Sequence, residues 1–171
     1  MNQPVIRKAS VKNVSFGKNV VVMEPSNIYD CTIGDDCFIG PFVEIQKGVV
    51  IGTRTKVQSH SFICELVTIG SNCFISHGAM FINDLFTDGG PAGGRKELWK
   101  STTIGNHVSI GTNATVLPVA ICDHVVIGAG SVVTKDVSPF SLVYGNPARQ
   151  VGTVNKKGMV TEKNKADDRV S

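Results

Sequence analysis

The clearest pattern in the chain is an aliphatic residue at every sixth position. The pattern runs without a break through Ile33, Ile39, Ile45, Ile51, Val57, Ile63, Ile69 and Ile75, and Phe81 continues it. Four residues after each of these positions comes a small or β-branched residue, namely Cys37, Val43, Val49, Thr55, Ser61, Val67, Cys73 or Ala79. One large and one small inward residue in every six predict one flat face of a prism. Three such faces make a coil of about 18 residues in a parallel β-helix.

The repeat stops after Phe81 and resumes at Ile104, and residues 87–103 between them are rich in Gly and Pro. Long loops in compact domains are usually functional or disordered. The pattern therefore predicts one β-helix domain over residues 1–154 with an excursion loop at about 87–103. A polar tail over residues 155–171 is expected to be mobile, and residues 1–32, which follow the repeat poorly, are expected to form an irregular cap.

The composition supports an all-β fold and excludes several classes of function. The chain has 24 Val and 14 Ile against 5 Leu, and β-branched residues favour strands. A net charge of +3 and an aromatic content of 6% argue against nucleic-acid binding. Five cysteines without a C-x-x-C pair argue against a disulfide framework or a zinc site. No secretory signal or bilayer-spanning stretch is evident, so the cytoplasm is the expected location, without a membrane partner.

A polar column marks the beginning of the excursion loop. Residues 18 apart should stack on neighbouring coils, which places Lys47, Glu65 and Asn83 in one column, with Asp84 next to Asn83. A polar cluster at the root of a long loop is a candidate site. The alternative is a solvated face with ordinary turn residues.

Two histidines are candidate bases near this column. The same spacing places Ser59 under His77 and Phe42 under His60. A neutral imidazole can accept a proton from an attacking amine or hydroxyl. A structural role for His60 and His77 remains equally open.

The later repeats contain a glycine-rich turn and two basic residues. The turn Gly128, Ala129 and Gly130 would let backbone amides approach a ligand, and Lys135 and Arg149 are candidate phosphate partners. The sequence contains no P-loop, H-E-x-x-H or G-x-S-x-G motif.

Over roughly residues 10–152, the chain resembles the left-handed β-helix, hexapeptide-repeat acyltransferases. Residues 113–118, 126–137 and 144–149 look like the acetyl-CoA-binding end of that family. The resemblance implies a left-handed coil, acetyl-CoA as co-substrate, no metal, and a homotrimer with its active sites between subunits.

Residues 58–65 and 77–84 are similar to the branch that N-acetylates amino sugars carried on UDP or dTDP for bacterial surface polysaccharides such as lipopolysaccharide. In that branch the Asn-Asp pair at the loop root lies at the active site. The resemblance implies catalytic roles for Asn83 and Asp84, followed by His60 and His77. Glu65 and Lys47 are the expected substrate-binding residues, whereas residues 85–90 depart from the branch's usual Tyr-Pro-Arg continuation.

The expected function is therefore N-acetyl transfer to a nucleotide-linked amino sugar. The first alternative is O-acetyl transfer to a sugar or another small hydroxyl acceptor. Carbonic-anhydrase-like members of the fold bind zinc through three histidines, but Ile82 stands where one of those histidines is expected. A trimeric scaffold whose loop binds a partner is the non-enzymatic alternative.

Overall fold

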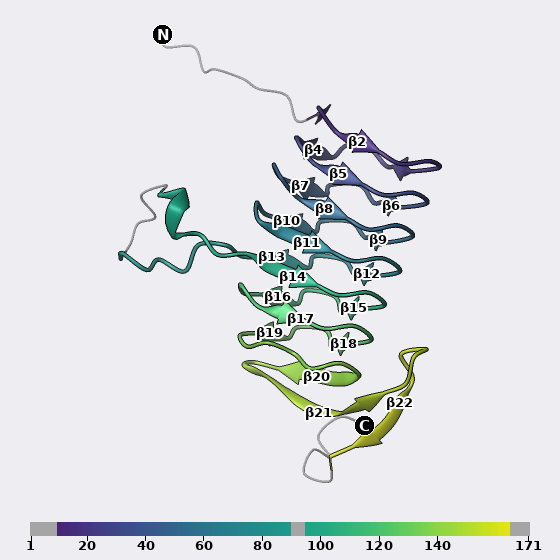
Figure 1. Cartoon of the computed structure of the whole chain (residues 1–171), viewed down its shortest axis with the longest axis vertical. Coiled ribbons are helices and arrows are strands. Elements are labelled where there is room, and N and C mark those ends of the chain that lie inside the picture. Colours follow the sequence, from purple (N-terminus) through teal and green to yellow (C-terminus); the bar gives the residue numbers. More distant parts are fainter. Residues whose placement is uncertain (1–9, 90–94, 165–171) are drawn as a thin grey trace.

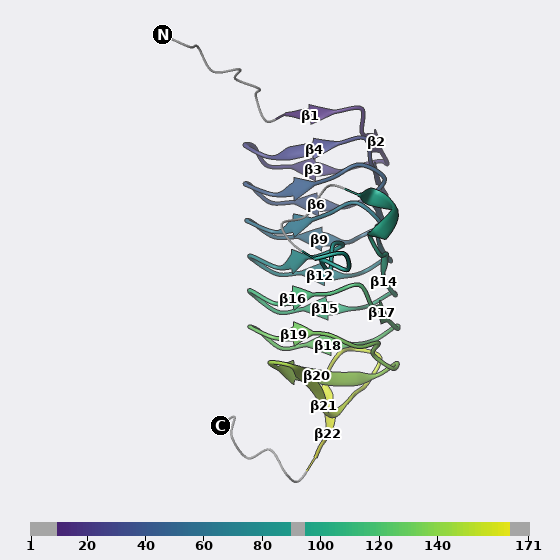
Figure 2. The same cartoon turned by 90° about the vertical axis from the view of Figure 1, so that its left-hand side faces the viewer.

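The computed structural model describes residues 10–89 and 95–164. Short strands wind into a column of stacked coils, and the excursion loop leaves the column near β13 (Met80–Phe81) and β14 (Thr102–Ile104) (Figures 1 and 2). Most coils contribute one strand to each of three sheets, whose strands pair in parallel except at the C-terminal end of the third sheet, where the last two strands join by antiparallel pairing. Within the described residues, no helix is long and apolar enough to cross a membrane.

The first sheet has the beginning of the excursion loop, with Asn83, at one side and the candidate histidines His60 and His77 at the other. Its strands, in spatial order, are β1 (Val11–Lys12), β4 (Asn27–Tyr29), β7 (Glu44–Ile45), β10 (Phe62–Ile63), β13 (Met80–Phe81), β16 (Thr115–Val116) and β19 (Val132–Val133).

The other two sheets complete the prism. The second contains β2 (Ser15–Phe16), β5 (Thr32–Ile33), β8 (Val50–Ile51), β11 (Val67–Ile69), β14 (Thr102–Ile104) and β17 (Ala120–Ile121). The third contains β3 (Val21–Val22), β6 (Phe38–Ile39), β9 (Lys56–Val57), β12 (Phe74–Ile75), β15 (Ser109–Ile110), β18 (Val126–Ile127), β20 (Ser141–Gly145), β21 (Ala148–Val154) and β22 (Val160–Lys163).

The six-residue repeat forms the core, as predicted. The aliphatic residues of the repeat are at most 2% exposed, and Cys37, Thr55, Ser61 and Ala79 are also buried. Phe62 pairs with Glu44 on one side and Met80 on the other, which confirms the 18-residue step in this part of the chain. The all-β parallel β-helix is therefore confirmed.

The third residue after most of the aliphatic positions turns a corner with positive φ. His60 has φ 63°, and Gly78 and Gly130, in the same place on later coils, have φ 67°. A side chain with a Cβ is strained in this region, so glycine relieves the turn. His60 is therefore held at a corner that the backbone tightly defines.

Three boundaries differ from the sequence-based expectation. The first coils are regular rather than irregular, because Val11 pairs with Ile28 and Phe16 with Ile33. The excursion is shorter at its end, since residues 102–104 form β14 and pair with β11. Residues 160–163, expected in a mobile tail, form β22 and pair with β21. Residues 1–9 of the expected cap, 90–94 of the excursion loop and 165–171 of the tail lie outside the described residues.

Thr55 tests how much the small inward position contributes to stability. Its fully buried Oγ1 donates to Gly70 O at 2.8 Å and accepts from the Cys73 N–H at 3.1 Å. Thr55→Val keeps the shape but leaves both backbone groups without this partner, so we expect a loss of about 1–3 kcal/mol in the free energy of unfolding. Chemical denaturation would measure it, with the exposed Thr68→Val as the control within about 0.5 kcal/mol of wild type. Equal stability of the two variants would contradict this role.

Candidate functional site

The excursion loop leaves and re-enters the coil at the corner between the first and second sheets. Asn83 follows β13 at this corner, and its side chain is buried. Asn83 Nδ2 donates to Glu65 O on the preceding coil at 3.2 Å, and Asn83 O accepts from the Lys100 N–H at the end of the loop. Asn83 therefore joins two coils to the loop.

The loop folds back onto both neighbouring carboxylates. Lys96 Nζ lies 2.5 Å from Glu65 Oε1, and the Glu65 side chain is only 19% exposed. Asp84 Oδ2 accepts from Trp99 Nε1 at 3.2 Å, while its Oδ1 accepts from the Phe86 N–H at 2.8 Å. Glu65, Asn83 and Asp84 thus form one cluster beneath the loop, which we call the loop-root cluster.

Three residues of earlier coils adjoin this cluster. Gln46 Oε1 accepts from the Glu65 N–H at 3.3 Å, and Gln46 Nε2 donates to Glu44. Burial and the nearby carboxylates of Glu44 and Glu65 raise the pKa of Tyr29, which keeps its hydroxyl protonated as a donor. Tyr29, Glu44 and Gln46 were not among the residues predicted from the sequence, because the 18-residue spacing places Lys47, not Gln46, level with Glu65.

Lys47 lies at the predicted height in this column, but among the described residues it forms no ion pair with Glu65. Its side chain is exposed at the corner. Glu65 instead meets Lys96, a loop residue that the repeat could not place. The lysine that lies beside the Glu65 carboxylate is therefore Lys96 and not the expected Lys47.

The histidines lie on the other side of the first sheet, at its corner with the third. The predicted stacking is confirmed, since Ser59 Oγ and His77 Nδ1 are 2.8 Å apart and the Phe42 and His60 rings stack at 4.9 Å. Their expected position near the loop-root cluster is wrong within one chain. His77 lies in the turn before β13 and Asn83 follows β13, so this strand stands between them.

The predicted coenzyme-binding residues lie at the last coils. Lys135 and Arg149 line one pocket of about 180 Å³ below β19. Gly128, Ala129 and Gly130 turn the corner between β18 and β19, and a Cβ added at Gly130 would meet nothing within 4 Å. This corner continues the line of His77, because Asn113 N donates to His77 O and Gly130 N donates to Thr112 O.

The thiol beside the loop-root cluster is not a nucleophile. Cys64 is 2% exposed, and burial raises its pKa to about 11, with a smaller contribution from Glu65. A thiol with this pKa stays protonated near neutral pH, whereas the thiolate is the reactive form. Among the residues that the structure describes, no three His, Cys, Asp or Glu side chains are grouped to hold a metal ion.

Comparisons with known families identify the repeats. Residues 30–65 match the family described as bacterial transferase hexapeptide (six repeats). Residues 101–135 match the hexapeptide repeat of succinyl-transferase. The chain therefore carries the repeats of the hexapeptide-repeat transferases.

Among curated proteins, the chain is similar to one part of a larger enzyme. It is 32% identical over 175 residues to the bifunctional protein GlmU of Thermotoga petrophila, and 33% identical over 162 residues to that of Clostridium beijerinckii. Both alignments cover 92% of this chain but only 36% and 33% of those proteins. The chain thus spans about a third of the length of these relatives.

Solved structures share the fold. A mutant of AntD, an N-acyltransferase from Bacillus cereus in complex with dTDP and coenzyme A, has a TM-score of 0.75 and 23% identity, covering 84% of this chain and 85% of that one. The hexapeptide-repeat acetyltransferase VCA0836 from Vibrio cholerae, complexed with acetyl-CoA, has a TM-score of 0.57 and 25% identity, covering 81% of this chain and 70% of that one.

Proposed function

We propose that this chain, built from the repeats of hexapeptide-repeat transferases, moves an acetyl group from acetyl-CoA to the amino group of a UDP- or dTDP-linked amino sugar. The observation that carries the proposal is the ion pair in the loop-root cluster, where Glu65 already holds an ammonium group, that of Lys96. A half-buried carboxylate that binds an ammonium suits an amine acceptor. Synthesis of bacterial surface polysaccharides and a cytoplasmic location are parts of the same proposal.

The comparisons support the donor and the acceptor class. The acetyl-CoA complex of VCA0836 supports acetyl-CoA as the donor. We assign Lys135 and Arg149, which line one pocket, to its phosphates, and the Gly128–Gly130 corner to its chain. The dTDP and coenzyme A in the AntD structure, whose fold this chain shares, support a nucleotide-linked acceptor.

The transfer is proposed to proceed directly from thioester to amine. Glu65 and Asp84 bind the incoming ammonium, and Asn83 orients the neutral amine after the ammonium has given one proton to solvent. The amine nitrogen forms a bond to the thioester carbonyl carbon, the C–S bond breaks, and the nitrogen's proton passes to a base or to the departing CoA thiolate. Backbone amides at the later coils would stabilise the developing oxyanion, an effect worth about 3 kcal/mol in other enzymes.

The separation of the two groups of residues supports a site between subunits. One corner of the first sheet carries the loop-root cluster, and the opposite corner carries His60, His77 and the Gly128–Gly130 turn. In a cyclic homotrimer, one corner of each chain would face the other corner of its neighbour. The predicted homotrimer therefore belongs to this proposal, because it would bring His77 of one chain toward Asn83 of the next.

The chemical nature of the product tests the proposal. Purified protein would be incubated with acetyl-CoA and nucleotide-linked amino sugars, and the acetylated product treated with mild hydroxylamine. We expect an amide, which resists this treatment. A product that hydroxylamine cleaves would be an ester and would contradict N-acetyl transfer.

O-acetyl transfer is the second candidate, and the Ser59–His77 contact favours it. When His77 Nδ1–H donates to Ser59, Nε2 has a free lone pair that can accept a proton. A hydroxyl needs such a base more than an amine does, and general-base catalysis contributes about 100- to 10,000-fold.

His77→Ala distinguishes the two candidates. For N-acetyl transfer with the CoA thiolate taking the proton, we expect kcat to fall by no more than about tenfold. A loss of about 1,000-fold or more would indicate an essential base. Thiol release would be measured alongside His107→Ala, a matched control at a distant corner.

A further inference from the structure

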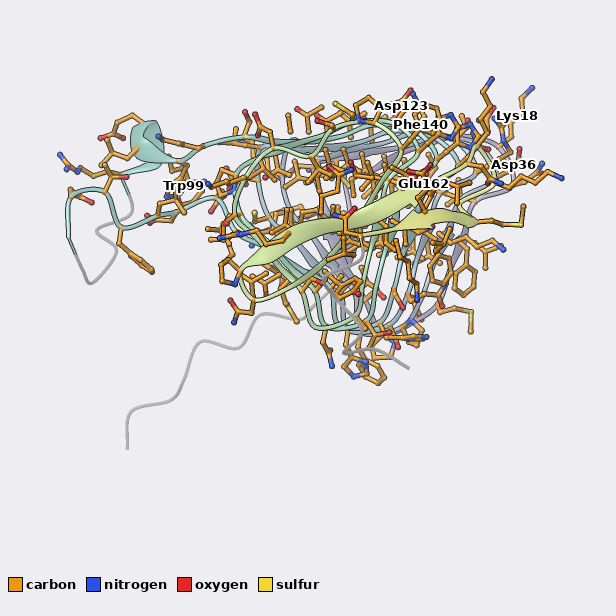
Figure 3. All side chains as sticks on the ribbon, turned by 90° about the horizontal axis from the view of Figure 1, so that it is seen from below. Lys18, Asp36, Trp99, Asp123, Phe140 and Glu162 are labelled. Atoms are coloured by element: carbon orange, nitrogen blue, oxygen red, sulfur yellow. The ribbon has the colours of Figure 1, made fainter. Side chains whose placement is uncertain are left out.

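We infer that Trp99, the only tryptophan of the chain, is a positioning residue that aims the Asp84 carboxylate at the acceptor amine. The inference rests on the proposed function and names a part of the machinery that the repeat pattern does not contain. Figure 3 shows Trp99 on the excursion loop, beside the body of the β-helix.

The hydrogen bonds of Asp84 leave its carboxylate with one orientation. Oδ1 accepts from the Phe86 N–H within the loop root, and Oδ2 accepts from Trp99 Nε1 across the loop. The first bond ties Asp84 to its own turn. The second bond comes from the far end of the excursion, so it is the one that sets the direction of the carboxylate relative to the coil.

The loop backbone delivers Trp99 to this position together with Lys96. The short 3₁₀ helix η1 (Lys96–Leu98) ends at Trp99, and residues three apart lie on one side of such a helix. Lys96 Nζ accordingly lies 5.0 Å from the centre of the Trp99 ring while it pairs with Glu65. Trp99 thus bonds directly to the Asp84 carboxylate and lies beside Lys96, the residue that pairs with the Glu65 carboxylate.

This arrangement gives the loop a defined role during binding. An incoming ammonium replaces Lys96 at Glu65, and the released Lys96 keeps its cation–π contact with the Trp99 ring. Asp84 meanwhile keeps its direction because the indole N–H remains bonded. Trp99 therefore acts through Asp84 and need not touch the acceptor.

A double-mutant cycle tests the role of Trp99. Trp99→Phe keeps an aromatic ring for Lys96 but removes the N–H, and we expect kcat to fall about tenfold while the KM for acetyl-CoA stays unchanged. In the Asp84→Ala background the same change should cost less than about twofold, because the group it positions is gone. Glu97→Ala, an exposed neighbour on η1, controls for disturbance of the loop and should retain wild-type kcat.

The results distinguish this inference from the proposed function. Equal losses for Trp99→Phe in both backgrounds, with an active wild type, would overturn the positioning role and leave the proposed function intact. A wild type that acetylates no acceptor would overturn both. Asp84→Ala should also shift the emission of Trp99 in ligand-free protein, and an unchanged spectrum would contradict the contact itself.

Discussion

Replacing Asn83 with alanine is expected to lower kcat about 100- to 1,000-fold without unfolding the protein. The loss is of the size found when one aligned donor is removed from an active site. Asn83 Nδ2 bonds to the backbone of Glu65 in the absence of acceptor, so the stability cost should stay near 1 kcal/mol. Thiol release from acetyl-CoA would give the kinetics, and the thermal midpoint would report folding.

Asn106→Ala is the matched control for this variant. Asn106 Oδ1 also bonds to a neighbouring coil, accepting from the Ser71 N–H at 2.9 Å, but it lies at the corner of the second and third sheets. Asn106 is more exposed than Asn83, so its replacement should cost no more stability, and kcat should stay at the wild-type value. Near-normal turnover in Asn83→Ala would remove Asn83 from the active site.

Arg149→Ala is expected to raise the KM for acetyl-CoA about 10- to 100-fold with little change in kcat. Arg149 lines the pocket below β19 together with Lys135, and its guanidinium is exposed to a ligand there. A charged hydrogen bond to a phosphate contributes about 1.5–3 kcal/mol, which corresponds to this range. Initial rates at varied acetyl-CoA and saturating acceptor would measure it.

Lys163→Ala provides the control for charge alone. Lys163 ends β22 and is exposed outside the pocket, so its removal also lowers the net charge by one. Its KM for acetyl-CoA should match that of wild type. A KM for Arg149→Ala that equals the control's would show that the pocket does not bind the coenzyme.

The repeat made most of the coil predictable. An aliphatic residue in every sixth place specifies both the strand face and the corner, so the periodicity alone places Ile45 and Ile63 on adjacent strands, where they pair. The 18-residue spacing correctly predicted that Ser59 stacks with His77 and Phe42 with His60. Local periodicity carries this information because each coil contacts only its neighbours.

The sequence-based expectations failed in two situations: where the corner of the coil that a residue occupies determines its neighbours, and in the excursion loop, which has no repeat. His77 and Asn83 are near in sequence, but one strand of the first sheet separates them, so proximity along the chain was misleading. Lys96 and Trp99 reach the loop-root cluster through a short 3₁₀ helix that no six-residue pattern encodes. The regular first coils were missed because Val11 and Phe16 are exposed there and pair at a step of 17 residues.

The most direct measurement is thiol release from acetyl-CoA with a panel of UDP- and dTDP-linked 2-, 3- and 4-amino sugars. Each amino sugar would be paired with the same nucleotide sugar carrying a hydroxyl in place of the amine. The proposal predicts release with at least one amino sugar and none with its hydroxyl counterpart. Release with the hydroxyl sugars alone, or no release across the panel while acetyl-CoA still binds, would contradict N-acetyl transfer to a nucleotide-linked amino sugar.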